Sequence, residues 1–186
     1  WMRTYRTDPV LEAKHGPTYI LVDPARVTKS GADYTAIVVF RLGEDDNVYI
    51  LDMYRDRYET REFKDLMFYL HGDTSVERGP GWGEGGWAPK IVFEEISGAD
   101  RDLGHFKDEM ELRGYGFDMR AIPHDKLKKE ERIRGLQTVM EGGKIWFPTY
   151  FGHAPKSDNR DTKQIFIEDE YSQWSPEGGA LHDDLL

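Results

Sequence analysis

The chain has 186 residues, a formal net charge of −10 and no cysteine. This length suits one well-packed domain and is short for two, and 38% hydrophobic residues indicate a globular protein rather than a disordered one. The cysteine count excludes disulfides, thiolate metal sites and cysteine nucleophiles, and no segment reaches the ~18 apolar residues of a membrane span. The negative charge argues against strong free-standing binding to nucleic acid, because that affinity comes mostly from neutralising phosphates.

Residues 1–17 form a polar stretch that contains Pro9 and Pro17, and we expect a linker or entry segment there. Strands are predicted next, because the following segments are rich in β-branched and aromatic residues. The connection at residues 43–46, Gly-Glu-Asp-Asp, is short enough to predict that the strands on either side of it pair antiparallel. The predicted strands cover residues 18–23, 34–41 and 47–54.

A glycine-rich segment at residues 72–89 lies between a predicted helix at 61–71 and a predicted strand at 90–95. It contains Trp82 and Trp87 and indicates a surface loop or small insertion rather than core structure. In the simplest interpretation the two tryptophans pin the loop to its own surface. Stacking on bases and contact with a partner protein are the alternatives.

Helix and strand patterns then alternate to the end of the chain. They predict one α/β domain over residues 18–186, with a central sheet of mixed strand direction flanked by helices. The remaining predicted elements are helices at 100–113, 127–141 and 162–174, strands at 117–122 and 144–147, and a further helix that begins at residue 181.

Acidic residues stand at three points that such a sheet can bring together. In open α/β sheets, ligands collect at the carboxyl ends of strands, where the first two of these points fall. Carboxylate oxygens without cysteine or clustered histidine suit Mg²⁺ or Mn²⁺ rather than zinc, and two such ions can cleave a phosphodiester. The acids are Asp23 after the apolar run 19–22, Glu94 and Glu95 after the run 91–93, and Asp183 and Asp184 near the end of the chain.

Each acid also has a structural interpretation, which the sequence leaves open. Asp23 can cap a turn at a strand exit, the two glutamates can form a solvated strand end, and Asp183 and Asp184 can cap a helix N-terminus. Glu94 is favoured over Glu95 as a ligand, because it directly follows the apolar run and successive strand side chains alternate between faces.

Basic residues near these acids are candidates for holding DNA phosphates. Lys129 and Arg132 lie three apart on one face of a predicted helix. Arg26 and Lys29 lie in the loop after Asp23. The alternative is a solvated surface with local ion pairs.

The order of elements is similar to that of the ribonuclease H-like fold, in which the acids lie on the first strand, the fourth strand and a late helix. The chain resembles the C-terminal nuclease domain of the terminase large subunit of tailed bacteriophages, the DNA-packaging motor protein. The resemblance spans residues 18–186. Its segments, in order, are Leu21–Ala25 with Ser30–Ile37, Ile91–Glu95, Lys129–Arg132 leading to Gly143–Pro148, and His182–Leu186.

The resemblance implies a metal-dependent endonuclease that cleaves double-stranded viral concatemer DNA during genome packaging, using two Mg²⁺ or Mn²⁺ ions. Asp23, Glu94, Asp183 and Asp184 would be catalytic metal ligands, with Glu95 as a further candidate. The implied partners are a terminase ATPase domain, the small subunit and the portal protein, and the implied location is the host cytoplasm. The sequence has no G-x-x-x-x-G-K-[ST] motif, so we expect an excised nuclease domain without ATPase activity.

Three other functions fit parts of this pattern. A non-catalytic docking module of a packaging motor would use the acids structurally and the tryptophan loop for binding. Another ribonuclease H-like nuclease, such as a junction resolvase or a transposase core, would share the acids. An actin-like kinase or ATPase requires a Gly-Thr/Ser turn after the first acid, where this chain has Pro24-Ala25-Arg26.

Overall fold

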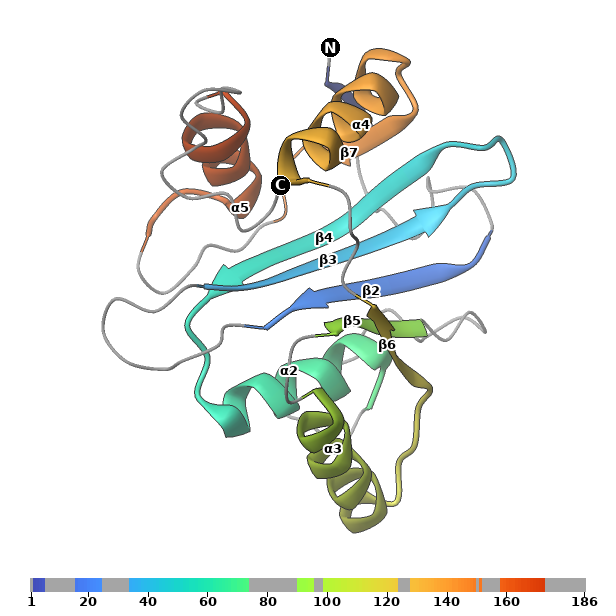
Figure 1. Cartoon of the computed structure of the whole chain (residues 1–186), viewed down its shortest axis with the longest axis vertical. Helices are drawn as coiled ribbons and strands as arrows, with labels where there is room; N and C mark the ends of the chain where they lie inside the picture. The colour runs from blue at the N-terminus through green and yellow to red at the C-terminus, as the bar shows by residue number, and fades with distance from the viewer. Residues whose placement is uncertain are drawn as a thin grey trace.

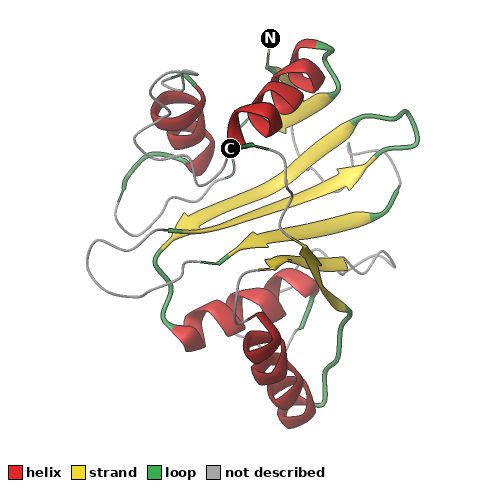
Figure 2. Cartoon of the chain, in the orientation of Figure 1, coloured by secondary structure: helices red, strands yellow, loops and turns green. Residues whose placement is uncertain are grey.

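The computed structural model describes residues 2–5, 16–24, 34–73, 90–95, 99–123, 128–149, 151 and 158–172. Within them one mixed sheet has the strand order β1-β7-β4-β3-β2-β5-β6, and helices lie on both of its sides (Figures 1 and 2). The strands are β1 (Arg3–Tyr5), β2 (Thr18–Asp23), β3 (Thr35–Leu42), β4 (Val48–Asp56), β5 (Lys90–Glu95), β6 (Met119–Pro123) and β7 (Ile145–Pro148). The helices are α2 (Thr60–His71), α3 (Ala99–Arg113), α4 (Lys129–Glu141), α5 (Thr162–Ile165) and the π-helix η1 (Phe166–Tyr171).

Strand direction in the sheet is mixed, as the sequence predicts. Strand β3 pairs antiparallel with both β2 and β4, so the predicted antiparallel pairing across residues 43–46 is confirmed. The other pairs are parallel: β2 with β5, β5 with β6, β4 with β7, and β1 with β7. The carboxyl ends of β2 and β5 therefore lie at the same end of the sheet.

The N-terminal segment contributes a strand where the sequence suggests a linker. Residues 3–5 form β1, which adds an edge strand beside β7, with Arg3 opposite Trp146. The Tyr5 hydroxyl donates to the Ile50 carbonyl at 2.5 Å, and Tyr5 itself is buried. A strand of three residues is too short to show an alternating apolar pattern of its own, so local sequence does not indicate it.

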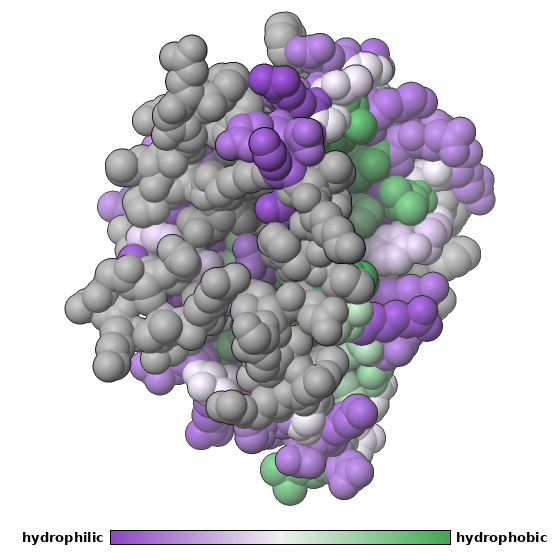
Figure 3. All heavy atoms as spheres, viewed as in Figure 1, coloured by the Kyte–Doolittle hydropathy of each residue, from purple (hydrophilic) through white to green (hydrophobic). Residues whose placement is uncertain are grey.

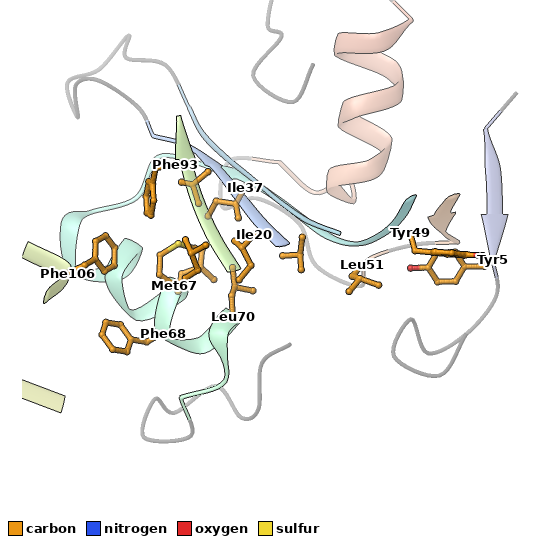
Figure 4. Packing of buried hydrophobic residues seen from close by; sticks show 14 residues of the cluster. Tyr5, Ile20, Ile37, Tyr49, Leu51, Met67, Phe68, Leu70, Phe93 and Phe106 are labelled. Carbon is orange, nitrogen blue, oxygen red and sulfur yellow. The ribbon is translucent and has the colours of Figure 1, made fainter. Parts of the chain in front are cut away.

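The two faces of the sheet carry separate hydrophobic clusters. The first lies beneath α2 and α3 and contains Ile20, Val22, Ile91, Phe93 and other side chains shown in Figure 4. The second lies beneath α4, α5 and η1, and its members include Met53, Met140, Ile145, Phe147 and Phe166. The molecule thus has three layers, with the sheet between two helical layers (Figure 1).

The helix predicted over residues 162–174 is α-helical only in its first turn. From Phe166 to Tyr171 it is a π-helix, and the Ser172 N–H donates to the Ile167 carbonyl, five residues back, at 3.0 Å. This segment buries both Phe166 and Glu170. A π-turn inserts one residue into the helical repeat and is frequent at functional sites.

Lys163 attaches this helical segment to the end of β7. The buried ammonium donates to the carbonyls of Pro148 at 2.6 Å and Thr149 at 3.1 Å. Burial lowers the pKa of Lys163. The position of η1 over the sheet is therefore fixed by a buried polar contact as well as by the apolar side chains of the second cluster.

Hydrophilic side chains cover most of the described surface in the view of Figure 3, with a smaller hydrophobic area among them. Leu21 and Ile122 are exposed large hydrophobic side chains on β2 and β6. In the part of the chain that the structure describes, no helix combines the length and apolar character that crossing a membrane requires.

Candidate functional site

Asp23 is the last residue of β2, as the sequence predicts, and it is exposed. The alternation along β2 explains its direction, because Thr18, Ile20 and Val22 are buried while Leu21 and Asp23 are exposed. Asp23 therefore belongs to the face opposite the first cluster. Its exposure means that the carboxylate keeps its hydration and does not carry the cost of a buried charge.

Position 94 lies next to position 23 in the sheet. Strands β2 and β5 run parallel with Val22 opposite Phe93, so the next residue of each strand is Asp23 and Glu94. Neighbouring strands are about 4.8 Å apart. The backbone therefore places two of the three predicted acidic points side by side at the carboxyl end of the sheet, although β2 and β5 are far apart in sequence.

The remaining predicted site residues are only partly described. Arg26, Lys29, Asp183, Asp184 and the segment 74–89 with its two tryptophans lie outside the described residues, as do the side chains of Glu94, Glu95 and Lys129. In the described part of the chain, no group of three His, Cys, Asp or Glu side chains is arranged to hold a metal ion. The choice between Glu94 and Glu95, and between Asp183 and Asp184, stays a prediction.

The predicted phosphate-binding pair occupies the first turn of α4. Lys129 is the first residue of the helix, and Arg132, three residues later, is exposed. Ile133 and Met140 of the same helix are buried. The helix thus has a buried apolar side and carries Arg132 at the surface, which fits either the phosphate-binding interpretation or the solvated one.

A buried ion pair, which the sequence analysis did not predict, lies near Asp23. The Arg55 Nε lies 3.1 Å from Glu170 Oε1, and the two side chains are 8% and 0% exposed. Ala36 is the cross-strand partner of both Asp23 on β2 and Arg55 on β4, so these three residues form one row across the sheet. A charged residue in Met53-Tyr54-Arg55-Asp56, directly after the apolar run of β4, is the signal that could have revealed it.

Tyr34 and Arg57 extend this ion pair toward the surface. The guanidinium carbons of Arg55 and Arg57 lie 3.8 Å and 4.2 Å from the centre of the Tyr34 ring. Arg57 is exposed, whereas Arg55 is buried. Glu170, Arg55, Tyr34 and Arg57 therefore form a continuous set of contacts from η1 to the solvent, which we call the Tyr34 stack.

Asp52 is a buried carboxylate that does not belong to this site. It accepts hydrogen bonds from its neighbour Met53 N–H at 3.0 Å and from the Tyr54 hydroxyl at 2.7 Å. Burial, reinforced by the negative charge of Asp52, raises the pKa of Tyr54 far above its usual range. Asp52 pairs with Val39, whose partner on β2 is Ile20, so it lies further back along the sheet than Asp23.

The sheet defines the class of fold. The strands β4-β3-β2-β5-β6 form a five-stranded mixed core in which β3 is antiparallel to both of its neighbours, and helices cover both faces. This is the ribonuclease H-like fold that the sequence predicts, with an acid at the end of the first core strand, β2, and another at the end of the fourth, β5.

Comparison with solved structures supports this fold. The structure is similar to the human cytomegalovirus terminase nuclease domain, with a TM-score of 0.63 at 10% sequence identity, over 97% of this chain and 85% of the other. A manganese-soaked, inhibitor-bound structure of that domain matches with a TM-score of 0.54 at 10% identity, over 90% of this chain and 80% of the other. At such low identity these similarities show the fold alone.

A yeast mitochondrial Holliday junction resolvase also matches, at 12% identity over 71% of this chain and 67% of the other, but its TM-score of 0.37 is too low to bear on the fold. No family model and no curated protein matches the sequence.

Proposed function

We propose that this chain is the nuclease domain of a terminase and cleaves double-stranded DNA with the help of divalent metal ions. The observation that carries the proposal is the placement of Asp23 and Glu94 at adjacent carboxyl ends of β2 and β5 in a ribonuclease H-like sheet. Similarity to the cytomegalovirus terminase nuclease domain supports the same conclusion. The order of the sequence motifs favours the tailed-bacteriophage branch of terminases.

The donor chemistry at this end of the sheet suits hard divalent cations. Asp23 presents an exposed carboxylate beside position 94, and oxygen ligands of this type favour Mg²⁺ or Mn²⁺. The manganese soak of the cytomegalovirus domain supports that choice. Asp23, Glu94 or Glu95, and Asp183 or Asp184 would hold the ions, which supply activation of a water and stabilisation of charge on the leaving oxygen.

The residues of this chain would then position the DNA. Asp23, at the end of β2, is accessible from solvent and fixes where the scissile phosphate approaches. Lys129 and Arg132, in the first turn of α4, would neutralise charge on a phosphate. Cleavage with little sequence preference is expected, because nothing in the sequence resembles a base-reading helix.

The larger assembly follows from the same proposal. A terminase nuclease would act beside an ATPase domain, the small subunit and the portal protein, on concatemeric viral DNA in the host cytoplasm. The net charge of −10 supports a requirement for such partners in DNA binding, because an acidic domain binds DNA weakly on its own.

Plasmid cleavage tests the proposal directly. Supercoiled plasmid is incubated with the purified chain in EDTA, Mg²⁺ or Mn²⁺, and nicking and linearisation are expected only with metal. Asp23→Asn should reduce cleavage to below a few per cent without unfolding the protein, because exposed positions usually change stability by less than about 0.5 kcal/mol. Glu111→Gln, an exposed carboxylate on α3, is the matched control and should cut normally.

A thermal shift gives a second measurement that does not depend on cutting. A ligand that binds only the folded state raises its stability by mass action, so Mn²⁺ should raise the melting temperature of the parent and of Glu111→Gln but not of Asp23→Asn. Equal metal-dependent cutting by Asp23→Asn and the parent would remove Asp23 from the site, and absence of both cleavage and metal stabilisation would contradict the proposed function.

A further inference from the structure

The Tyr34 stack ends in the exposed guanidinium of Arg57, which is held in position by its contact with the Tyr34 ring. Glu170 is fully buried and anchors Arg55 through the 3.1 Å ion pair, and Arg55 lies 3.8 Å from the Tyr34 ring centre. Arg57 lies over the same ring at 4.2 Å, and its side chain is exposed. A guanidinium stacked on an aromatic ring loses less conformational freedom on binding an anion than a free side chain does.

The stack lies on the same face and at the same end of the sheet as Asp23. In antiparallel pairs, opposite residues share a face, so the row Asp23, Ala36 and Arg55 points to one side. The ion pair of Arg55 with η1 shows that this is the side covered by the second helical layer. Arg57 lies one residue beyond β4, and it contacts the same Tyr34 ring as Arg55 does, which places it beside Arg55.

Strand geometry gives the separation between Asp23 and Arg57. Two strand spacings make about 10 Å and two residues along the strand add about 7 Å at right angles, so the two Cα atoms are roughly 12 Å apart. Each DNA strand carries one phosphate per about 3.4 Å of helix axis. A strand that runs from a scissile phosphate at Asp23 toward Arg57 would reach it within roughly two to four nucleotides.

We propose that Arg57 binds a backbone phosphate of the DNA strand being cut, and that Tyr34 and Arg55 hold it in place for this purpose. The inference rests on the proposed nuclease function. An acidic chain needs local positive charge where DNA approaches its carboxylates, and the planar guanidinium of arginine matches phosphate geometry better than an ammonium does. Arg57 is a binding residue and has no part in the bond-breaking step.

DNA binding by the full chain tests this inference, with Asp23→Asn as the parent so that no substrate is cut. A fluorescein-labelled 30-base-pair duplex is titrated by anisotropy at several salt concentrations near 50 mM. One phosphate contact contributes about −0.9 to the slope of log K against log salt, so its loss weakens binding about 10-fold at 50 mM. Arg57→Gln should show this loss and a slope shallower by about one, while Lys107→Gln, which removes an exposed charge on α3, should change neither by much.

Further variants separate the role of the ring from the role of the charge. Tyr34→Phe keeps the ring and should bind like the parent, whereas Tyr34→Leu removes it and should lose part of the affinity. Arg57→Lys should recover only part of what Arg57→Gln loses, because it restores charge without planar stacking. Melting temperatures measured alongside show whether a variant has lost affinity through unfolding.

The outcomes distinguish this inference from the proposed function. If Arg57→Gln is folded and binds the duplex with unchanged affinity and salt dependence, the inference is overturned, even if the protein that retains Asp23 cuts DNA. An Arg57-dependent affinity in a protein that never cuts would uphold the DNA contact and contradict the nuclease function. The inference would also be overturned by two results together. The Asp23→Asn protein would show no measurable duplex binding at 50 mM salt, and Arg57→Gln in the protein that retains Asp23 would leave the KM for plasmid cleavage unchanged.

Discussion

The Arg55–Glu170 ion pair is the feature whose removal should damage this fold most. Both side chains are almost completely buried, at 8% and 0% exposure, and their atoms lie 3.1 Å apart. Glu170→Gln keeps the shape of the side chain but removes the buried negative charge that pairs with Arg55. Breaking one partner of a buried pair costs about 3–5 kcal/mol, a large part of the roughly 5–15 kcal/mol that stabilises a typical domain.

Thermal and urea unfolding measure this effect. For a domain of this size, 1 kcal/mol corresponds to about 2–4 °C, so the melting temperature of Glu170→Gln should fall by about 6–20 °C. Glu168→Gln is the matched control on the same helix, because Glu168 is 56% exposed and pairs with Arg160 at the surface. Such exposed pairs contribute about 0–1 kcal/mol.

The double variant Arg55→Met/Glu170→Met separates the cost of breaking the pair from the value of the pair itself. Replacing both partners of a buried pair by apolar residues is often close to neutral, so the double variant should be more stable than Glu170→Gln. It also loses the contact of Arg55 with Tyr34, which limits the recovery. If Glu170→Gln is no less stable than Glu168→Gln, the reasoning from burial is refuted.

Two further predictions concern stability at the surface and at Gly143. Hydrogen bonds from Arg160 lower the pKa of Asp158 to about 2 from an ordinary value of 3.8, so this pair stabilises the fold above pH ~4 and the stabilisation is lost as pH falls through about 2. Arg160→Gln should therefore be less stable than the parent in urea at pH 4, by less than about 1 kcal/mol because the pair is partly exposed. This difference should shrink between pH 4 and pH 2. A constant difference would contradict this assignment. Gly143 has φ +67°, a left-handed conformation that is strained for a residue with a Cβ, so Gly143→Ala should cost about 1–2 kcal/mol in urea unfolding. Gly135→Ala, in an open stretch of α4, should instead stabilise by up to about 1 kcal/mol; equal effects of the two substitutions would argue against the strain at Gly143.

Local sequence predicted most of the fold because its elements have strong patterns of their own. The strands β2 to β5 are rich in β-branched and aromatic residues, and their observed ends lie within two residues of the predicted ones. The confirmed ribonuclease H-like architecture follows from the order of those elements. Strand β1 and the π-helix were missed, because three residues are too few to show a period and a π-turn differs from an α-turn by one inserted residue.

The candidate site was predictable only where it coincides with a strand end. Asp23 and Glu94 each follow an apolar run, and strand ends are where ligands collect in α/β sheets. Arg55 also follows an apolar run, but Tyr34 and Glu170 carried no comparable signal, and nothing in the sequence joins the three. Their importance comes from cross-strand register and from the docking of η1, which bring together residues from three separate segments.

The sequence by itself determined the fold class, the order of elements and the two strands that end in acids, because side-chain periodicity and β-propensity are properties of short segments. Only the tertiary structure decided that β2 lies beside β5, so that positions 23 and 94 become neighbours, and that Arg55 meets Glu170 beneath the Tyr34 ring. Pairing between distant strands and burial of a charge pair depend on contacts across the whole sheet, and no short segment encodes them.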